Sequence, residues 1–229
     1  MAGVMSFTEV AQVVSKTDAL LANVHRWDCL ARELQSTFPL ESIPLFDHVD
    51  CRATVLDYGC GEGRFLTRLA GRHTRVIGCD TSRRMCHLAK ASTRNAVVVA
   101  LADPRFLPSC ISGFHAVVAV GVLSSVVPAD ERRALVSRLW HRLPNQGVMV
   151  LADFGRSPAS GYLSRYRDAV LEEYTIRTAE GLLIHHFSLE ELVALIPPDG
   201  KLEVAQTVDA HTVHGNPLPG HVAVMRKTH

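Results

Sequence analysis

The sequence predicts an α/β protein with an open, doubly wound sheet of seven strands, a terminal antiparallel strand pair and an N-terminal helical cap. Between residues 51 and 155, runs rich in β-branched residues alternate with amphipathic helical stretches. This alternation is typical of βαβ units, in which helices cover both faces of a parallel sheet. Near the C-terminus, two more such runs flank a stretch of turn residues, which suits an antiparallel pair. The 229 residues, 47% of them hydrophobic, suffice for one full core and favour a single domain.

The N-terminal segment, residues 1–50, carries no strand pattern. Its helical periodicity is clearest over residues 10–35, and we expect it to form a helical cap. It lacks the basic start and apolar centre of an export signal, and no stretch of the chain is apolar enough to span a bilayer. The six cysteines show no metal-ligand spacing. We therefore expect a reduced, cytoplasmic protein without a membrane anchor and without a metal site.

Five strands and their connecting helices are predicted in the central part of the chain. The strands are 53–58, 74–80, 95–103, 115–123 and 146–154. The helices are 63–71, closed by Gly71, 82–92, capped by Ser82, and 128–147, which opens near Asp130 and stops at Pro144. The connection between the third and fourth strands, 102–114, is more irregular.

The chain changes character after Phe154. Residues 156–187 are richer in tyrosine and arginine, and residues 188–196 form a short predicted helix with a capping box from Ser188 to Glu191. The two late strands are 201–212 and 221–227, and turn residues join them over 213–220.

A glycine-rich loop, VLDYGCGEGRF at residues 55–65, ends the first strand and opens the first helix. Open α/β sheets bind their ligands at this place. A dinucleotide-binding GxGxxG would need a small residue where Arg64 stands, because the helix packs closely on the strand there. The spacing of Gly59, Gly61 and Gly63 therefore argues against an NAD site.

The string DYGCGEG resembles motif I of the class I S-adenosylmethionine-dependent methyltransferases, D/E-x-G-x-G-x-G, which implies a Rossmann-like fold. The resemblance covers about residues 50–155 and the late strand pair. It implies that Asp57 faces the ammonium of the cofactor's methionine end, a role that a phosphate-binding loop would not give to an acid. The neighbouring loop residues are then expected at the cofactor: Tyr58, Gly59, Cys60 and Gly61.

Further positions match the same family. Asp80, with Thr81 beside it, ends the second strand where the resemblance implies a carboxylate that accepts both ribose hydroxyls. NAD enzymes use the same acid, and Asp80 could instead cap the following helix. ALADPRFLP resembles the A-D-x-x-x-L-P motif, which implies that Ala102 borders the adenine ring and that Asp103 accepts from its amino group. FHAVVAVG resembles the motif F-D-x-V and implies that Gly121 lies beside the methionine moiety, although His115 stands where aspartate is common.

This resemblance divides the single domain into four parts. We expect a helical cap in 1–50, a cofactor-binding core in 51–155, a substrate lid insertion in 156–187, and a C-terminal helix and strand pair in 188–229. The oligomeric state is left open.

The expected chemistry is an in-line displacement, in which an O, N or C nucleophile attacks the electrophilic methyl group of the sulfonium. Alignment of the two reactants can supply about 7–11 kcal/mol of the barrier. A general base is optional, and position selects three candidates among the twelve histidines: His185, His186 and His25. Packing alone would also explain His186. Ser124 and Ser125 replace a histidine that many relatives carry.

The acceptor is expected to be a small apolar or aromatic molecule. The cap and the lid carry five large aromatic residues: Trp27, Tyr162, Tyr166, Tyr174 and Phe187. A net charge of +1 gives no long-range attraction for nucleic acid or membrane. Two alternatives remain open: a macromolecule methyltransferase acting on RNA or protein, and a non-catalytic binding protein that keeps the fold.

Overall fold

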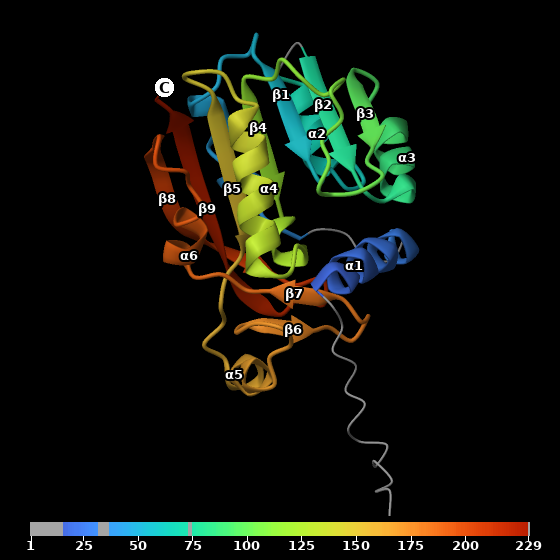
Figure 1. The fold of residues 1–229 in the computed structure, drawn as a ribbon, viewed down its shortest axis with the longest axis vertical. Helices are drawn as coiled ribbons and strands as arrows, with labels where there is room; N and C mark the ends of the chain where they lie inside the picture. The colour runs from blue at the N-terminus through green and yellow to red at the C-terminus, as the bar shows by residue number, and fades with distance from the viewer. Residues whose placement is uncertain (1–15, 32–36, 73–74, 229) are drawn as a thin grey trace, which may run out of the picture.

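The structure is a computed structural model that describes residues 16–31, 37–72 and 75–228. Its centre is a seven-stranded sheet with the order β3-β2-β1-β4-β5-β9-β8 (Figure 1). The strands are β1 Thr54–Tyr58, β2 Arg75–Asp80, β3 Ala96–Ala100, β4 Ala116–Val120, β5 Val148–Phe154, β8 Gly200–His211 and β9 Pro217–Lys227. The predicted strand count and the terminal antiparallel pair are therefore confirmed.

The strand order reverses at β1. The chain moves from β1 to β2 to β3 in one direction and then returns to β4 and β5, and all these neighbours pair in parallel. β9 pairs antiparallel with β5 and β8. A reversal of this kind leaves a crevice at the carboxyl ends of β1 and its neighbours, where open sheets bind ligands.

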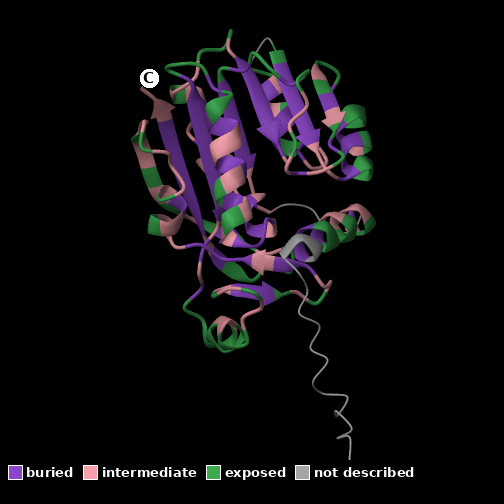
Figure 2. Ribbon diagram, in the orientation of Figure 1, coloured by how far each residue is buried: buried purple, intermediate pink, exposed green. Residues whose placement is uncertain are grey.

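Helices cover both faces of the sheet. One cluster of buried residues packs α2 (Arg64–Ala70) and α3 (Arg83–Ser92) on one face, and a second packs α4 (Ala129–His141) and α6 (Leu189–Val193) on the other. Figure 2 shows the central strands buried and the outer sides of these helices exposed. Both predicted N-caps form: the Ser82 Oγ accepts from the Met85 N–H and the Ser188 Oγ from the Glu191 N–H, each at 3.1 Å. The second half of the predicted capping box is replaced, because the Glu191 carboxylate contacts His185 and Arg156.

The cap contains α1, Lys16–Leu30, which lies across the carboxyl ends of the parallel strands (Figure 1). Two 3-10 turns follow, Leu40–Ser42 and Leu45–Asp47. Asn23 holds α1 in place: its amide donates to the carbonyls of Ser125 and Leu183 at 2.9 and 2.7 Å and accepts from the Leu183 N–H at 2.9 Å. The rest of the expected helix, residues 10–15 and 32–35, lies outside the described residues.

Two regions differ from the sequence prediction. Residues 156–187 contain elements that the pattern did not indicate: α5 Ser160–Arg167 and a hairpin of β6 Thr175–Arg177 and β7 Leu183–His185. β9 also begins at Pro217, inside the stretch expected to be a turn. The reason is that the antiparallel pairing of β8 with β9 extends as far as His211 opposite Pro217. None of the described helices is long and apolar enough to cross a membrane.

Candidate functional site

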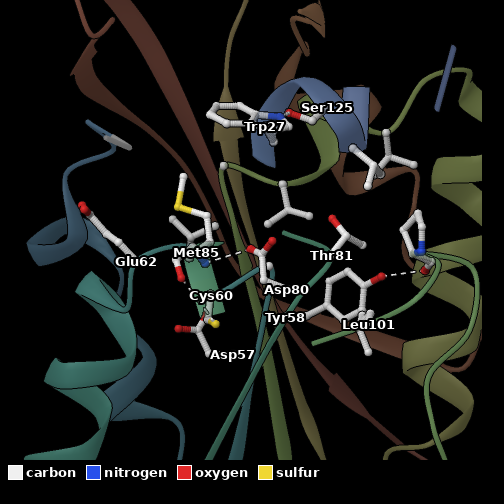
Figure 3. A pocket seen from close by; sticks show the side chains of 18 of the residues that line it. Trp27, Asp57, Tyr58, Cys60, Glu62, Asp80, Thr81, Met85, Leu101 and Ser125 are labelled. Atoms are coloured by element: carbon white, nitrogen blue, oxygen red, sulfur yellow. Dashed lines mark hydrogen bonds between the residues drawn. The ribbon is translucent and has the colours of Figure 1, made fainter. Parts of the chain in front are cut away.

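A pocket with a volume of about 1110 Å³, part of it open to solvent, lies beneath α1 at the carboxyl ends of the parallel strands. Figure 3 shows the side chains that line it. The sequence-predicted residues in this lining are Asp57, Tyr58, Gly59, Cys60, Gly61, Asp80, Thr81 and Gly121. The fold thus brings eight of the ten expected cofactor residues together.

The glycines of the loop differ in what they allow. A Cβ on Gly59 would lie 2.3 Å from a Val122 methyl group, so Gly59 lets the loop approach the segment after β4. A Cβ on Gly61 would meet no atom within 4 Å, and its φ of +53° lies in the left-handed region. Gly61 therefore leaves open space in the pocket, whereas Gly59 serves close packing of the protein on itself.

The Asp80 carboxylate ties the glycine loop to the start of α3. Its Oδ2 accepts from the Gly61 N–H at 2.9 Å (Figure 3), and its Oδ1 accepts from the Ser82 N–H at 2.8 Å. Burial raises the pKa of this carboxyl, and the backbone hydrogen bonds from Ser82 and Gly61 oppose the rise. Asp80 does support the entry to α3, and each of its oxygens keeps a lone pair for a ligand.

Asp57 is a buried acid with one carboxylate oxygen that no described residue contacts by a hydrogen bond. Its side chain lies at the end of β1 and is 2% exposed, and its Oδ2 has no hydrogen-bond partner among the described residues. Burial, and secondarily the charge of Asp80, raises the pKa of Asp57 to about 7. Buried polar atoms in native proteins are nearly always paired, so this oxygen marks a place for a donor that the described part of the chain does not supply.

The opposite side of the pocket is formed by α1 and the segment after β4. Trp27 of α1 donates from its Nε1 to the Ser125 Oγ at 3.0 Å. The rest of this wall is mainly apolar, with Leu20, Val24, Val122 and Val126. Tyr58 lies at another edge, where its hydroxyl donates to the Pro104 carbonyl at 2.6 Å (Figure 3) and holds the loop after β3.

Ala102 and Asp103 lie outside the pocket lining, although their neighbours Leu101 and Pro104 belong to it. Ala102 is exposed. The Asp103 carboxylate forms an ion pair with Arg105 at 2.6 Å, and the hydrogen bonds from Arg105 hold the pKa of Asp103 below its usual value. The Asp103 carboxylate is therefore already bound by the Arg105 guanidinium in this structure.

None of the three candidate histidines lines the pocket. His25 is exposed, with its Nε2 3.9 Å from the Cys29 Sγ. His185 is buried in a polar network beneath the hairpin, 2.9 Å from Glu191 and 3.0 Å from the Thr175 hydroxyl. The contacts of His185 give it a structural role in the hairpin.

His186 belongs to an aromatic cluster in the lid segment. Its Nδ1 lies 2.7 Å from the Tyr166 hydroxyl, and its ring lies 5.5 Å from that of Tyr162. Burial, followed by the charge of His185, lowers the pKa of His186 to about 3. Tyr166 also packs on Tyr174, so the three lid tyrosines contact each other or His186. Of the five aromatic residues expected around an acceptor, Trp27 is the one that lines the pocket.

Sequence reasoning missed pocket residues that come from α1, from α3 and from the turn after β4. Asn23, Met85 and Val122 line the pocket, and Ser125 lies in it as the partner of Trp27. No local motif marks them, because each contributes through a contact distant in sequence. Among the described residues, no group of His, Cys, Asp or Glu is arranged to hold a metal ion.

The chain is similar to known proteins in sequence and in structure. Residues 55–147 match a family model described as a methyltransferase domain. A tRNA N(3)-cytidine methyltransferase of Bos taurus is 25% identical over 166 residues, which are 68% of this chain and 43% of that protein. The chain thus spans less than half the length of this relative.

Solved structures share the fold. A SAM-dependent methyltransferase from Methanosarcina mazei superposes with a TM-score of 0.74 at 22% identity, over 85% of this chain and 99% of that one. The 1,6-didemethyltoxoflavin-N1-methyltransferase of Burkholderia thailandensis, solved with bound 1,6-didemethyltoxoflavin and S-adenosylhomocysteine, gives a TM-score of 0.64 at 20% identity. That comparison covers 100% of this chain and 93% of the Burkholderia chain.

The family model covers the glycine loop and the strands from β1 to β4, the part of the chain that the sequence motifs pointed to. The fold of the chain is that of the class I S-adenosylmethionine-dependent methyltransferases. The resemblance drawn from the sequence motifs is confirmed.

Proposed function

We propose that the pocket binds S-adenosylmethionine and that the protein passes its methyl group to an O, N or C nucleophile of a small, apolar or aromatic acceptor. The observation that carries the cofactor site is the unpartnered, buried Oδ2 of Asp57 beside the open space at Gly61. The ammonium of the methionine end supplies the donor that this oxygen lacks. The ion pair would offset the cost of burying the carboxylate.

The remaining cofactor roles follow the geometry. The free lone pairs of Asp80 would accept the ribose hydroxyls, with Thr81 next to them, and Gly121 would border the methionine moiety. Leu101 and Pro104 form the apolar edge that suits adenine. Asp103 would reach the adenine amino group only after it separates from Arg105.

The acceptor would lie between α1 and the segment after β4. Trp27 offers an aromatic face, which suits both a flat acceptor and the cationic sulfonium. Asn23 and Ser125 are the nearby polar side chains, and their hydrogen bonds hold α1 over the pocket. Such a wall keeps water away and aligns the nucleophile with the sulfur–methyl bond. We assign the lid role to 156–187 because Leu183 of this segment contacts Asn23 of α1. We also propose a cytoplasmic location for the protein.

Two relatives bear on the acceptor in opposite ways. The Burkholderia neighbour is named for a small aromatic substrate and matches nearly full length. The bovine relative is named for cytidine in tRNA and supports a macromolecular acceptor as the second candidate. The apolar wall beside Trp27 favours the first.

The cofactor site is tested by isothermal titration with S-adenosylhomocysteine on Gly61→Val. The valine side chain would occupy the open space, and we expect at least a hundredfold weaker binding. Gly215→Val is a matched control, because Gly215 also has a positive φ, +76°, and a Cβ added to it would meet no atom within 4 Å, but it lies in the turn between β8 and β9. Equal affinity of the two variants would refute the cofactor site.

The acceptor class is tested by a screen with methyl-labelled S-adenosylmethionine. Candidate small aromatic amines, phenols and thiols are compared with bulk tRNA and with protein. Faster transfer to tRNA or protein than to every small molecule would place the macromolecular alternative first. Cofactor binding without transfer to any acceptor would favour a binding protein.

A further inference from the structure

Basic residues are concentrated in one part of this nearly neutral chain. Residues 63–102 contain eight of the 24 Lys and Arg residues and one of the 23 Asp and Glu residues. That single acid is Asp80, whose carboxylate faces the pocket lining and two backbone N–H groups. The rest of the chain holds 16 basic and 22 acidic residues. The net charge of +1 therefore averages a basic part and an acidic part.

The fold places these residues on one layer of the molecule. They lie on or beside α2 and α3, which pack on the same face of the sheet and contact each other, as shown by the closeness of Gly63 to Ala89. Seven of the eight are exposed and the eighth, Arg68, is half-buried. We call this set the basic face: Arg64, Arg68, Arg72, Arg75, Arg83, Arg84, Lys90 and Arg94.

The charges of the basic face are hardly neutralised within the protein. Among the described residues, Arg84 is the one member that forms an ion pair, a loose one with Asp28 at 3.9 Å. Arg68 and Arg72 both lie over the Phe46 ring, at 5.4 and 5.1 Å from its centroid, which holds two guanidinium groups side by side. Each contact is a favourable cation–π interaction, but the two like charges repel each other and stay without an ion pair among the described residues.

The start of α3 also goes against helix electrostatics. Arg83 and Arg84 occupy its first turn, which contains no acidic residue. Cations at a helix N-terminus are unfavourable, because the helix dipole is positive there. Two carboxylates from outside the helix, Asp28 and Asp80, accept from groups at this end, but Arg83 forms no ion pair among the described residues.

We propose that the basic face is a binding surface for a nucleic acid strand, which adjoins the cofactor pocket at Arg64 and is independent of the proposed acceptor. Seven of its eight cations are arginine, whose planar fork binds phosphate oxygens bidentately and stacks on bases. The cations are spread over two neighbouring helices and their flanking turns, as contact with a series of phosphates requires. Of the large exposed hydrophobic residues described, only Val97 falls within 63–102. The basic face therefore lacks the apolar side chains with which a protein surface inserts into a membrane.

The test is fluorescence anisotropy of the full chain with a labelled, single-stranded RNA of 20 nucleotides and mixed sequence. The test variant is Arg83→Glu/Lys90→Glu/Arg94→Glu, whose three positions lie outside the pocket lining. The matched control is Arg133→Glu/Arg167→Glu/Lys201→Glu, which removes two exposed arginines and one exposed lysine elsewhere and has the same net charge. Titration with S-adenosylhomocysteine checks that the cofactor pocket stays intact in both variants.

We expect the parent to bind with a dissociation constant in the micromolar range at 50 mM salt, and the test variant to bind at least tenfold more weakly than the control. The slope of log affinity against log salt should fall by about 2, because each lost contact with a single strand lowers it by about 0.7. Equal losses in both variants would show attraction to overall charge only and would overturn the proposal. So would binding to vesicles with 30% phosphatidylserine in preference to RNA. Either result leaves the cofactor titration, and therefore the proposed function, unaffected.

Discussion

Replacing Asp57 by asparagine should stabilise the free protein and weaken its binding of the cofactor. The carboxylate of Asp57 is buried, and its Oδ2 has no partner among the described residues. Asparagine keeps the size of the side chain and removes the charge. The substitution therefore separates the cost of a buried charge from the shape of the pocket.

The size of the effect follows from the shift of the Asp57 pKa from 3.8 to about 7. One pKa unit corresponds to 1.36 kcal/mol, so the ionised side chain costs on the order of 4 kcal/mol at pH 8. Between pH 3.8 and about 7 the folded protein holds a proton that the unfolded chain has released. The free energy of unfolding of the parent therefore falls as the pH rises through this window and changes no further from this group above pH 7.

Thermal unfolding at pH 5 and pH 8 measures this difference. The melting temperature of Asp57→Asn should exceed that of the parent by several degrees at pH 8 and by clearly less at pH 5. For a chain of this length, 1 kcal/mol corresponds to about 2–4 °C. An equal difference at the two pH values, or a variant that melts below the parent at pH 8, would refute a raised pKa.

The same variant tests the ammonium partner. Because binding favours the ionised carboxylate, the affinity of the parent for S-adenosylhomocysteine should rise with pH up to about 7 and then level, with proton release below pH 7. Asp57→Asn should bind at least tenfold more weakly at pH 8 and show no such rise. Calorimetry in two buffers of different ionisation enthalpy measures the proton. A parent that releases none at pH 6 would contradict the ion pair.

Two further substitutions test the geometry of the pocket. Asp80→Ala should weaken the binding of S-adenosylhomocysteine at least tenfold, because a charged hydrogen bond contributes about 1.5–3 kcal/mol. An unchanged dissociation constant would mean that Asp80 only holds the loop and α3. Asn23→Ala should lower the free energy of unfolding by about 2–3 kcal/mol, because it leaves the buried polar groups of Leu183 without their partner. Urea unfolding measures this loss, and a change below about 0.5 kcal/mol would show that α1 is held by other contacts.

The sheet and the glycine loop could be predicted because short-range patterns encode them. A buried parallel strand such as Thr54–Tyr58 reads as an apolar run, and the capping residues Ser82 and Ser188 lie beside the N–H groups they accept from. The position of Asp80 follows from the strand end alone. Each of these features is decided within a few residues of the chain.

The lid and the far wall of the pocket could not be predicted in this way. The strands of the hairpin, Thr175–Arg177 and Leu183–His185, are three residues long and too short to show a period. The rings of Tyr166 and Tyr174 were expected around an acceptor, but composition does not show whether aromatic residues face a ligand or each other. The contact of Asn23 with Leu183 joins residues 160 positions apart.

The uneven distribution of charge is present in the sequence, but the net charge of the whole chain does not reveal it. A net charge of +1 disfavours a polyanionic partner only when the charges are mixed over the surface. In this chain, residues 63–102 carry one acid, and the fold then gathers the basic side chains of that segment on the layer of α2 and α3. Whole-chain charge is therefore no argument against nucleic acid for this protein.

α1 connects parts of the site that lie far apart in the sequence. Towards its middle, Asn23 is buried and bonds to the segment after β4 and to the hairpin, while Asp28 accepts from the Ser82 hydroxyl at the start of α3 at 2.7 Å. The Asp28 side chain is 37% exposed, and its ion pair with Arg84 is loose. Exposed pairs of this kind contribute little, whereas breaking the buried bonds of Asn23 leaves polar groups unpaired. The ion pair with Arg84 therefore adds little to the contact of α1 with α3, which depends on the hydrogen bonds that Asp28 accepts from the Ser82 hydroxyl and the Arg84 N–H.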